Sequence, residues 1–271
     1  MSEHSCASTF LNRKKVEQDK LATVPEDTSY TSEGHYVPAR LFTPADGTDQ
    51  KPGVLLCPGR LREIDGLAFI AEALNDAGMV VLATAYRGMD MRPDDQDCLD
   101  GLEYLASLNE VDKERLAIVG HSRGAMASLR VAAKTDRVKA VVALQPVADL
   151  SAYVLATRAY APNRYEALRR GMGDTPEAVA EAYRPLSAIH YADRIHVPVL
   201  LVAGTQDLHS PVDESLRMRD ALVAAGNPNV QLEVLEGVGH FFEKMYSGYQ
   251  HADVVSRVVG WLAPSLALTP V

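Results

Sequence analysis

Short apolar runs alternate with stretches of helical spacing along the chain from about residue 53 onward. Apolar runs bounded by turn residues are typical of strands buried on both faces, and strands that alternate with helices are typical of a parallel sheet covered on both sides. The predicted strands span residues 53–57, 79–85, 115–119, 138–144, 197–203 and 231–235, and the predicted helices span residues 67–77, 96–108, 125–133, 211–225 and 252–262. The pattern therefore predicts an α/β fold with a mostly parallel sheet and helices on both faces.

Two segments depart from this alternation. Residues 36–42, preceded by 31–34, predict an antiparallel hairpin that leads into the sheet. Residues 150–195 hold no strand-like run, and a structureless loop of that length is improbable in a compact domain. We therefore expect a helical insertion, with helices at 151–160, 165–172 and 176–183. Because it follows the strand 138–144, it would form a lid above the C-terminal ends of the strands, where open α/β sheets bind ligands.

The length of 271 residues lies within the range of a single α/β domain. We expect that domain over residues 26–265, with the lid at about 150–195, after a polar N-terminal arm at 1–25. The net charge of −9 leaves no basic surplus to neutralise phosphates, which argues against nucleic acid and against anionic membrane surfaces as partners. The sequence leaves open whether the chain forms a homo-oligomer.

Cofactor and targeting signals are missing from the pattern. No apolar run approaches the roughly 20 residues of a membrane span, and residues 1–20 carry charges in place of the apolar core of a signal peptide, so we expect a cytoplasmic protein. Cys6, Cys57 and Cys98 are odd in number and lack the close spacing of a metal site, so reduced thiols are expected. No glycine-rich nucleotide loop is present either. The sequence therefore predicts no metal and no cofactor.

The segment Gly120-His121-Ser122-Arg123-Gly124 lies between a predicted strand and a predicted helix. In this context a Gly-x-Ser-x-Gly segment is a nucleophile elbow, a turn so tight that it needs small residues at both glycine positions. Ser122 would stand at the tip of the turn, with its hydroxyl exposed to substrate. The backbone N–H of Arg123, at the start of the helix, would point at an oxyanion formed beside it.

A serine nucleophile needs a base, and the base needs an acid that orients it. His240 is the candidate base, because Gly-Val-Gly-His places it on a glycine-rich loop directly after the strand 231–235. Asp207 is the candidate acid, because it follows the strand 197–203 at the same edge of the sheet. Alternatively Asp207 caps the next helix, and Asp149, after the preceding strand, is the acid.

The second oxyanion donor is expected on the loop Pro58-Gly59-Arg60-Leu61, after the first core strand. Pro58 has no N–H, so the donor is most simply the backbone of Arg60, with Leu61 as the alternative.

The insertion carries aromatic and flexible side chains of the kind that line small-molecule pockets. We expect Tyr153, Tyr160 and Met172, together with Leu61, to contact the substrate. The alternative is that these side chains pack onto the domain below. Residues 151–173 also hold four arginines, at 158, 164, 169 and 170, against one glutamate. A guanidinium that faces the pocket would bind a substrate carboxylate, whereas the alternative places all four in solvent.

These motifs resemble those of the α/β-hydrolase superfamily, and more narrowly its prolyl oligopeptidase and dienelactone hydrolase branch. The matching segments lie at residues 85–88, 115–124, 195–207 and 237–240. The resemblance implies Ser122 as nucleophile, His240 as base and Asp207 as acid, in agreement with the placement argued from the residues. Many relatives carry His-Gly-Gly where this chain has Pro58-Gly59-Arg60. The chain has no room for the propeller domain that gates the peptidase members, which favours small esters.

The sequence therefore predicts a serine hydrolase that cleaves small-molecule carboxylic esters through an acyl-enzyme, without a cofactor. A small peptidase, a thioesterase or an acyltransferase on the same triad are the alternatives among enzymes. A different class is a catalytically silent member that binds a small molecule in the same pocket.

Overall fold

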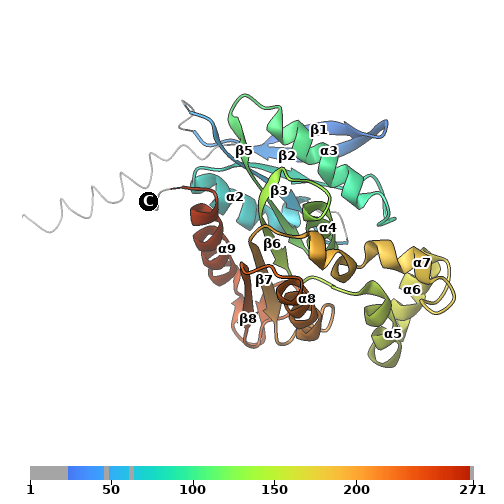
Figure 1. Cartoon of the computed structure of the whole chain (residues 1–271). Coiled ribbons are helices and arrows are strands. Elements are labelled where there is room, and N and C mark those ends of the chain that lie inside the picture. Colours follow the sequence, from blue (N-terminus) through green and yellow to red (C-terminus); the bar gives the residue numbers. More distant parts are fainter. Residues whose placement is uncertain (1–23, 46–48, 61–63, 269–271) are drawn as a thin grey trace, which may run out of the picture.

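An eight-stranded sheet forms the centre of the structure (Figure 1). The computed structural model describes residues 24–45, 49–60 and 64–268 of the chain. The strands are β1 (Glu26–Ser32), β2 (His35–Phe42), β3 (Lys51–Cys57), β4 (Val80–Thr84), β5 (Val111–His121), β6 (Val138–Leu144), β7 (Val199–Gly204) and β8 (Val230–Leu235). Their order in the sheet is β1-β2-β4-β3-β5-β6-β7-β8, antiparallel at β1–β2 and β2–β4 and parallel elsewhere. The predicted α/β fold with a mostly parallel sheet is confirmed.

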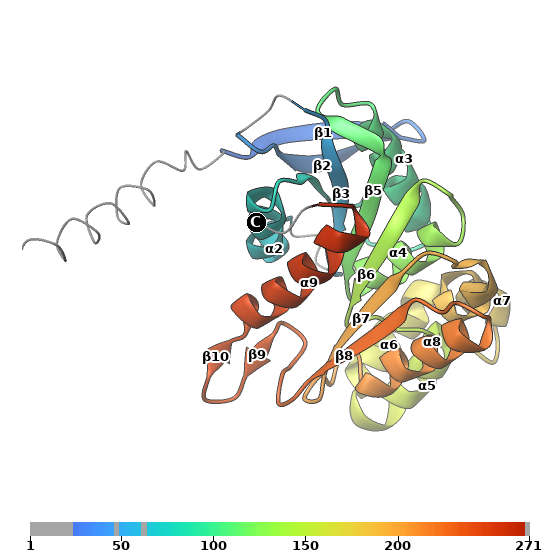
Figure 2. The same ribbon diagram turned by 60° about the vertical axis from the view of Figure 1, so that its left-hand side comes forward.

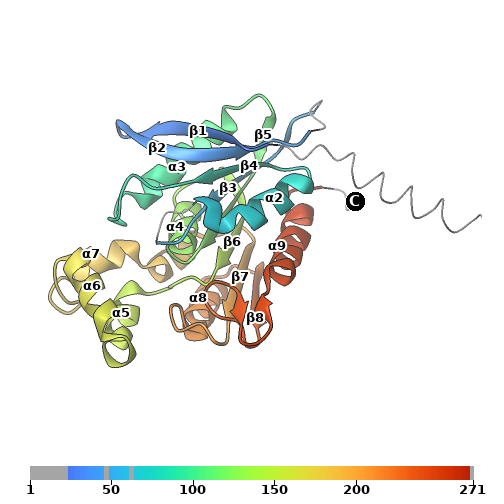
Figure 3. The ribbon, with the colours of Figure 1, turned by 180° about the vertical axis from the view of Figure 1, so that it is seen from behind.

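Helices cover both faces of this sheet (Figures 2 and 3). Along β3, Leu55 and Cys57 belong to one hydrophobic core, whereas Val54 and Leu56 belong to a second, as expected for a strand buried on both faces. The first core packs under three helices, α3 (Asp94–Ala106), α4 (Arg123–Ala132) and α8 (Val212–Ala224). The second packs under α2 (Ala68–Asp76), preceded by the 3₁₀ helix Ile64–Leu67, and under α9 (His251–Ser265).

The insertion after β6 is helical and projects as one group at the lower right of Figure 1. It contains α5 (Leu150–Tyr160), α6 (Pro162–Met172) and α7 (Ala180–Tyr183), followed by the 3₁₀ helices Arg184–Leu186 and Ala188–Arg194. A small third core holds these helices together and joins them to Met126 of α4; it includes Leu150, Tyr153, Val154, Tyr165 and Tyr183.

The elements differ from the expected ones mainly at their ends. The helix expected at 176–183 is one short turn, Ala180–Tyr183, and α6 begins earlier than expected because Pro162 is favourable in the first helical turn. A two-stranded hairpin, β9 (Glu243–Lys244) and β10 (Gly248–Tyr249), had no counterpart among the expected elements. The expected N-terminal arm lies outside the described residues except for positions 24 and 25. No helix in the described part of the chain is long and apolar enough to span a membrane.

Candidate active site

Ser122 occupies a strained turn between the end of β5 and the start of α4. Its backbone has φ 54° and ψ −113°, a left-handed conformation that a non-glycine residue rarely adopts. A Cβ on Gly120 would overlap the carbonyl of Gly124, and one on Gly124 would overlap the carbonyl of Cys57. The two glycines therefore let strand, turn and helix approach closely enough to present Ser122 at the tip.

His240 and Asp207 form a buried pair at the same edge of the sheet. Nδ1 of His240 lies 2.7 Å from Oδ2 of Asp207, and both side chains are buried. The second carboxylate oxygen of Asp207 accepts the backbone N–H groups of His209 at 2.7 Å and Ser210 at 2.8 Å. These bonds satisfy the carboxylate in its ionised form, so Nδ1 of His240 carries the proton and Nε2 is left as an acceptor.

Asp149, the alternative acid, has a different role. It is the N-cap of α5, where its carboxylate accepts the N–H of Ala152 at 3.1 Å. It thus satisfies one of the free N–H groups at the start of the first lid helix.

His121 joins the loop that carries His240 to the turn at Ser122. Nε2 of His121 lies 2.9 Å from the His240 carbonyl and 3.0 Å from Oε1 of Gln145, whose own amide donates to the Gly239 carbonyl at 2.7 Å. Burial, and then the neighbouring His240, lower the pKa of His121 to about 4. A neutral ring with its proton on Nε2 suits both acceptors.

The loop after β3 lies directly beside Ser122. A Cβ placed on Gly59 would be 3.7 Å from the Cβ of Ser122. The Tyr86 hydroxyl donates to the Pro58 carbonyl at 3.0 Å, which fixes the start of this loop. Arg60 follows and is exposed, whereas Leu61, the other expected donor and a substrate contact, lies outside the described residues.

The side chain of Arg123 is directed into the protein. Its guanidinium binds both oxygens of Asp94, at 2.7 and 2.6 Å, and the carbonyl oxygens of Gly88 and Asp90, and it lies over the ring of Tyr86 at 4.5 Å. This network joins the turn at Ser122 to the loop after β4. The backbone N–H of Arg123 lies at the first position of α4, at the positive end of the helix dipole.

The scan against family models matches residues 67–269 to the prolyl oligopeptidase family, Peptidase S9. An uncharacterized protein of Mycobacterium tuberculosis is 30% identical over 213 residues, which cover 76% of this chain and 69% of the relative. The chain belongs to the prolyl oligopeptidase family.

Solved structures agree on the α/β-hydrolase fold. A puromycin-hydrolyzing peptidase of Mycobacterium tuberculosis superposes with a TM-score of 0.77 at 24% identity, over 92% of this chain and 41% of that one. Est1E from Butyrivibrio proteoclasticus superposes with a TM-score of 0.71 at 19% identity, over 89% of this chain and 99% of that one. The chain therefore spans about two fifths of the peptidase but nearly all of Est1E. Its family is one of serine hydrolases.

The lid residues that were expected to contact the substrate differ in how deeply they are buried. Tyr153 is buried, and its hydroxyl donates to the carbonyl of His209 at 2.7 Å. Tyr160 is 46% exposed, and Met172 packs against the small core of the lid.

His209 also lies at the site, although the sequence analysis did not single it out. Its ring stacks on that of His240, with centroids 4.7 Å apart and an interplanar angle of 17°. The signal in the sequence was its position two residues after Asp207 on a loop already assigned to the site.

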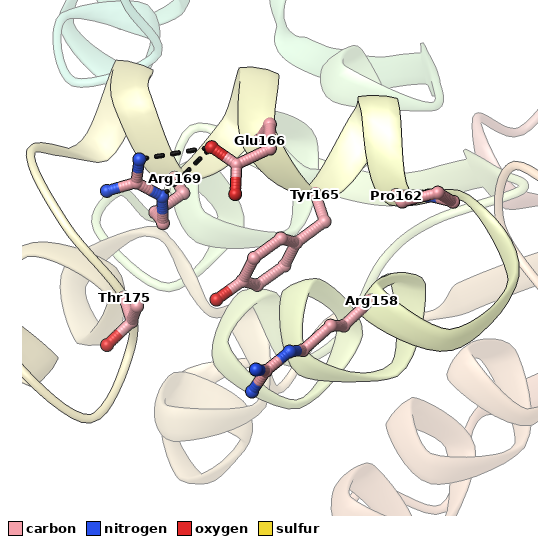
Figure 4. Close-up of a pocket in the computed structure, with 6 residues that line it drawn as sticks. All are labelled: Arg158, Pro162, Tyr165, Glu166, Arg169 and Thr175. Atoms are coloured by element: carbon pink, nitrogen blue, oxygen red, sulfur yellow. Dashed lines mark hydrogen bonds and ion pairs between the residues drawn. The ribbon is translucent and has the colours of Figure 1, made fainter.

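A cavity of about 490 Å³ opens within the lid, between α5, α6 and the following loop (Figure 4). Arg169, on its rim, pairs with Glu166 at 3.0 Å and Asp174 at 3.3 Å, and Arg158 lies over the ring of Tyr165. Arg170 points to Glu166 at 3.9 Å. Three of the four lid arginines thus stay within the lid, and Arg164 is the one that contacts a residue beside His240.

Among the described residues, no group of three or more His, Cys, Asp or Glu side chains could hold a metal ion.

Proposed function

We propose that this chain is a carboxylic ester hydrolase that forms an acyl-enzyme on Ser122 and acts on small molecules. The observation that carries the proposal is the 2.7 Å contact between His240 and Asp207 beside a strained serine turn. The similarity of the fold to that of Est1E, of which the chain covers 99%, supports the proposal.

In the proposed mechanism His240 acts as base and then as acid. Its free Nε2 takes the Ser122 proton as the hydroxyl oxygen attacks the ester carbonyl, and it later gives that proton to the leaving alcohol. Asp207 stabilises the imidazolium through the Nδ1 hydrogen bond. Water, activated by the same His240, then releases the acid and restores the serine, so the cycle needs no cofactor.

The negative charge on the carbonyl oxygen is held by backbone N–H groups. Arg123 supplies one from the N-terminus of α4, where the helix dipole also favours an anion. Arg60 supplies the other from the loop whose Gly59 lies against Ser122. This chain has Pro58-Gly59-Arg60 at the position of the His-Gly-Gly of many relatives, and the bond from Tyr86 to the Pro58 carbonyl supports this loop.

The acyl group would lie under the lid, in contact with Tyr153, Tyr160 and Met172. These residues combine aromatic faces with a flexible thioether, a surface suited to a small apolar acyl group.

Hydrolysis of an aminoacyl amide is the second candidate, because a structural neighbour is a puromycin-hydrolyzing peptidase and a relative in Bacillus subtilis is an uncharacterized peptidase. A panel of p-nitrophenyl esters and aminoacyl p-nitroanilides separates the two. We expect kcat/KM to be highest for short esters. Faster cleavage of the anilides would assign the chain to the peptidases, and no turnover of either series would indicate a silent binder.

A further inference from the structure

Arg164 of α6 joins the lid to the loop that carries Asp207. Its Nη2 lies 2.7 Å from Nδ1 of His209, and its Nη1 donates to the Tyr153 hydroxyl at 3.1 Å and to the Leu208 carbonyl at 3.4 Å. Within the described residues, no carboxylate pairs with this guanidinium. Arg164 is therefore a positive charge held by neutral acceptors next to the site.

The contact with Arg164 fixes the protons of the His209 ring. A guanidinium has donors and no acceptor and keeps its charge in proteins, so Nδ1 of His209 must be the acceptor. The neutral ring then carries its proton on Nε2. A second proton on Nδ1 would replace this hydrogen bond by a repulsive contact between two cations.

The surroundings of His209 also favour its neutral form. Partial burial, Arg164 and His240 lower the pKa of His209, whereas Asp207 and Glu243 oppose this shift. The charged and titratable groups that act on the ring are Arg164 from α6, Asp207 from its own loop, and His240 and Glu243 from the segment after β8, while the Tyr153 hydroxyl bonds the backbone carbonyl of His209. Of these, Arg164 is the group in contact with Nδ1.

The charge state of His209 matters because its ring is stacked on His240. In each proton transfer His240 becomes an imidazolium, and a second imidazolium at a centroid distance of 4.7 Å would oppose that charge. We propose that Arg164 is a positioning residue that acts through His209: it holds this ring neutral, in the Nε2–H form, beside the catalytic base and so extends activity to lower pH. The inference rests on the proposed role of His240.

The pH profile of kcat/KM, measured in a double-mutant cycle, tests whether Arg164 acts through His209. Arg164→Leu should move the acid limb upward by up to about half a pH unit, because loss of the Arg164 charge raises the pKa of His209 and the ring then competes with His240 for a proton. Arg164→Lys, which keeps a donor and a positive charge, should restore most of the profile. In a His209→Phe background, Arg164→Leu should cause no shift. An equal shift in that background would mean that Arg164 acts on His240 directly through space and not through His209. An unchanged pH profile of Arg164→Leu itself would also refute the proposed role of Arg164.

A second measurement is independent of turnover. Long-range ¹H–¹⁵N spectra of the labelled full chain report the tautomer and titration of His209. We expect the Nε2–H tautomer with a lowered pKa in the unmodified protein, and a mixture of tautomers with a higher pKa in Arg164→Leu. An Nδ1–H tautomer in the unmodified protein would contradict the inference whether or not the protein cleaves esters. Absence of ester turnover with the expected spectra would refute the proposed function alone.

Discussion

Replacing Asp207 by Asn tests the assignment of the acid. The asparagine fills the same buried space, and its carbonyl oxygen can still accept the N–H groups of His209 and Ser210. Its amide nitrogen must then face Nδ1 of His240 and donate to it. This selects the His240 tautomer with the proton on Nε2, which cannot accept the proton of Ser122. We expect kcat to fall by about 10³ to 10⁴, the range found for this change in other serine hydrolases, or about 4 to 5.5 kcal/mol in the barrier.

The matched control is Asp149→Asn, at the start of α5. Since Asp149 contacts the N–H of Ala152, this change should cost at most about 1 kcal/mol of stability and leave kcat within about twofold. Steady-state kinetics on the best ester of the panel, with urea unfolding of both variants, gives the two numbers. A larger loss of kcat in Asp149→Asn than in Asp207→Asn would refute the assignment.

Two further predictions concern the serine turn and its support. Gly124→Ala should lower the free energy of unfolding by about 3 kcal/mol or prevent folding, because the new methyl group overlaps the backbone carbonyl of Cys57. Gly171→Ala in α6, which has open space around it, should instead raise the free energy of unfolding by about 0.5 to 1 kcal/mol. Equal effects of the two substitutions in urea unfolding would contradict the packing argument. His121 has a pKa of about 4 when folded and about 6.5 when unfolded, so its neutral form stabilises the fold above pH 6.5 and this contribution is lost as the pH falls toward 4. Between pH 8 and pH 5 the free energy of unfolding should therefore fall by about 2 kcal/mol more than in His121→Gln, and parallel curves for the two proteins would show that His121 is protonated in the folded state.

The pattern of apolar and polar residues along the chain predicted the parallel part of the sheet and the loops that carry Asp207 and His240. The apolar runs that became β3, β4, β6 and β7 are buried along almost their whole length, so their hydrophobic signal was nearly continuous. Asp207 and His240 were found because each follows a predicted strand directly. Their positions in the chain predicted that they lie at the same edge of the sheet, and the structure places Nδ1 of His240 2.7 Å from Oδ2 of Asp207.

No local sequence pattern predicted the contacts that the lid makes with the rest of the protein. Arg164 and His209 are 45 residues apart, and their bond exists because α6 folds back over the loop after β7. The stacking of His209 on His240 depends on the same long-range packing. For the same reason, charge counting gave the lid an excess of arginines but did not show that Arg169 and Arg170 point to Glu166 while Arg164 reaches the site.

Covalent capture of Ser122 by a fluorophosphonate tests the central claim most directly. Peptide mapping of the labelled protein should place the adduct on Ser122, because Ser122 stands in the strained turn and is the nucleophile of the proposed mechanism. Ser122→Ala should lose both labelling and ester turnover while it unfolds at the same urea concentration as the unmodified protein. An adduct on another residue, or ester turnover that persists in Ser122→Ala, would contradict the account.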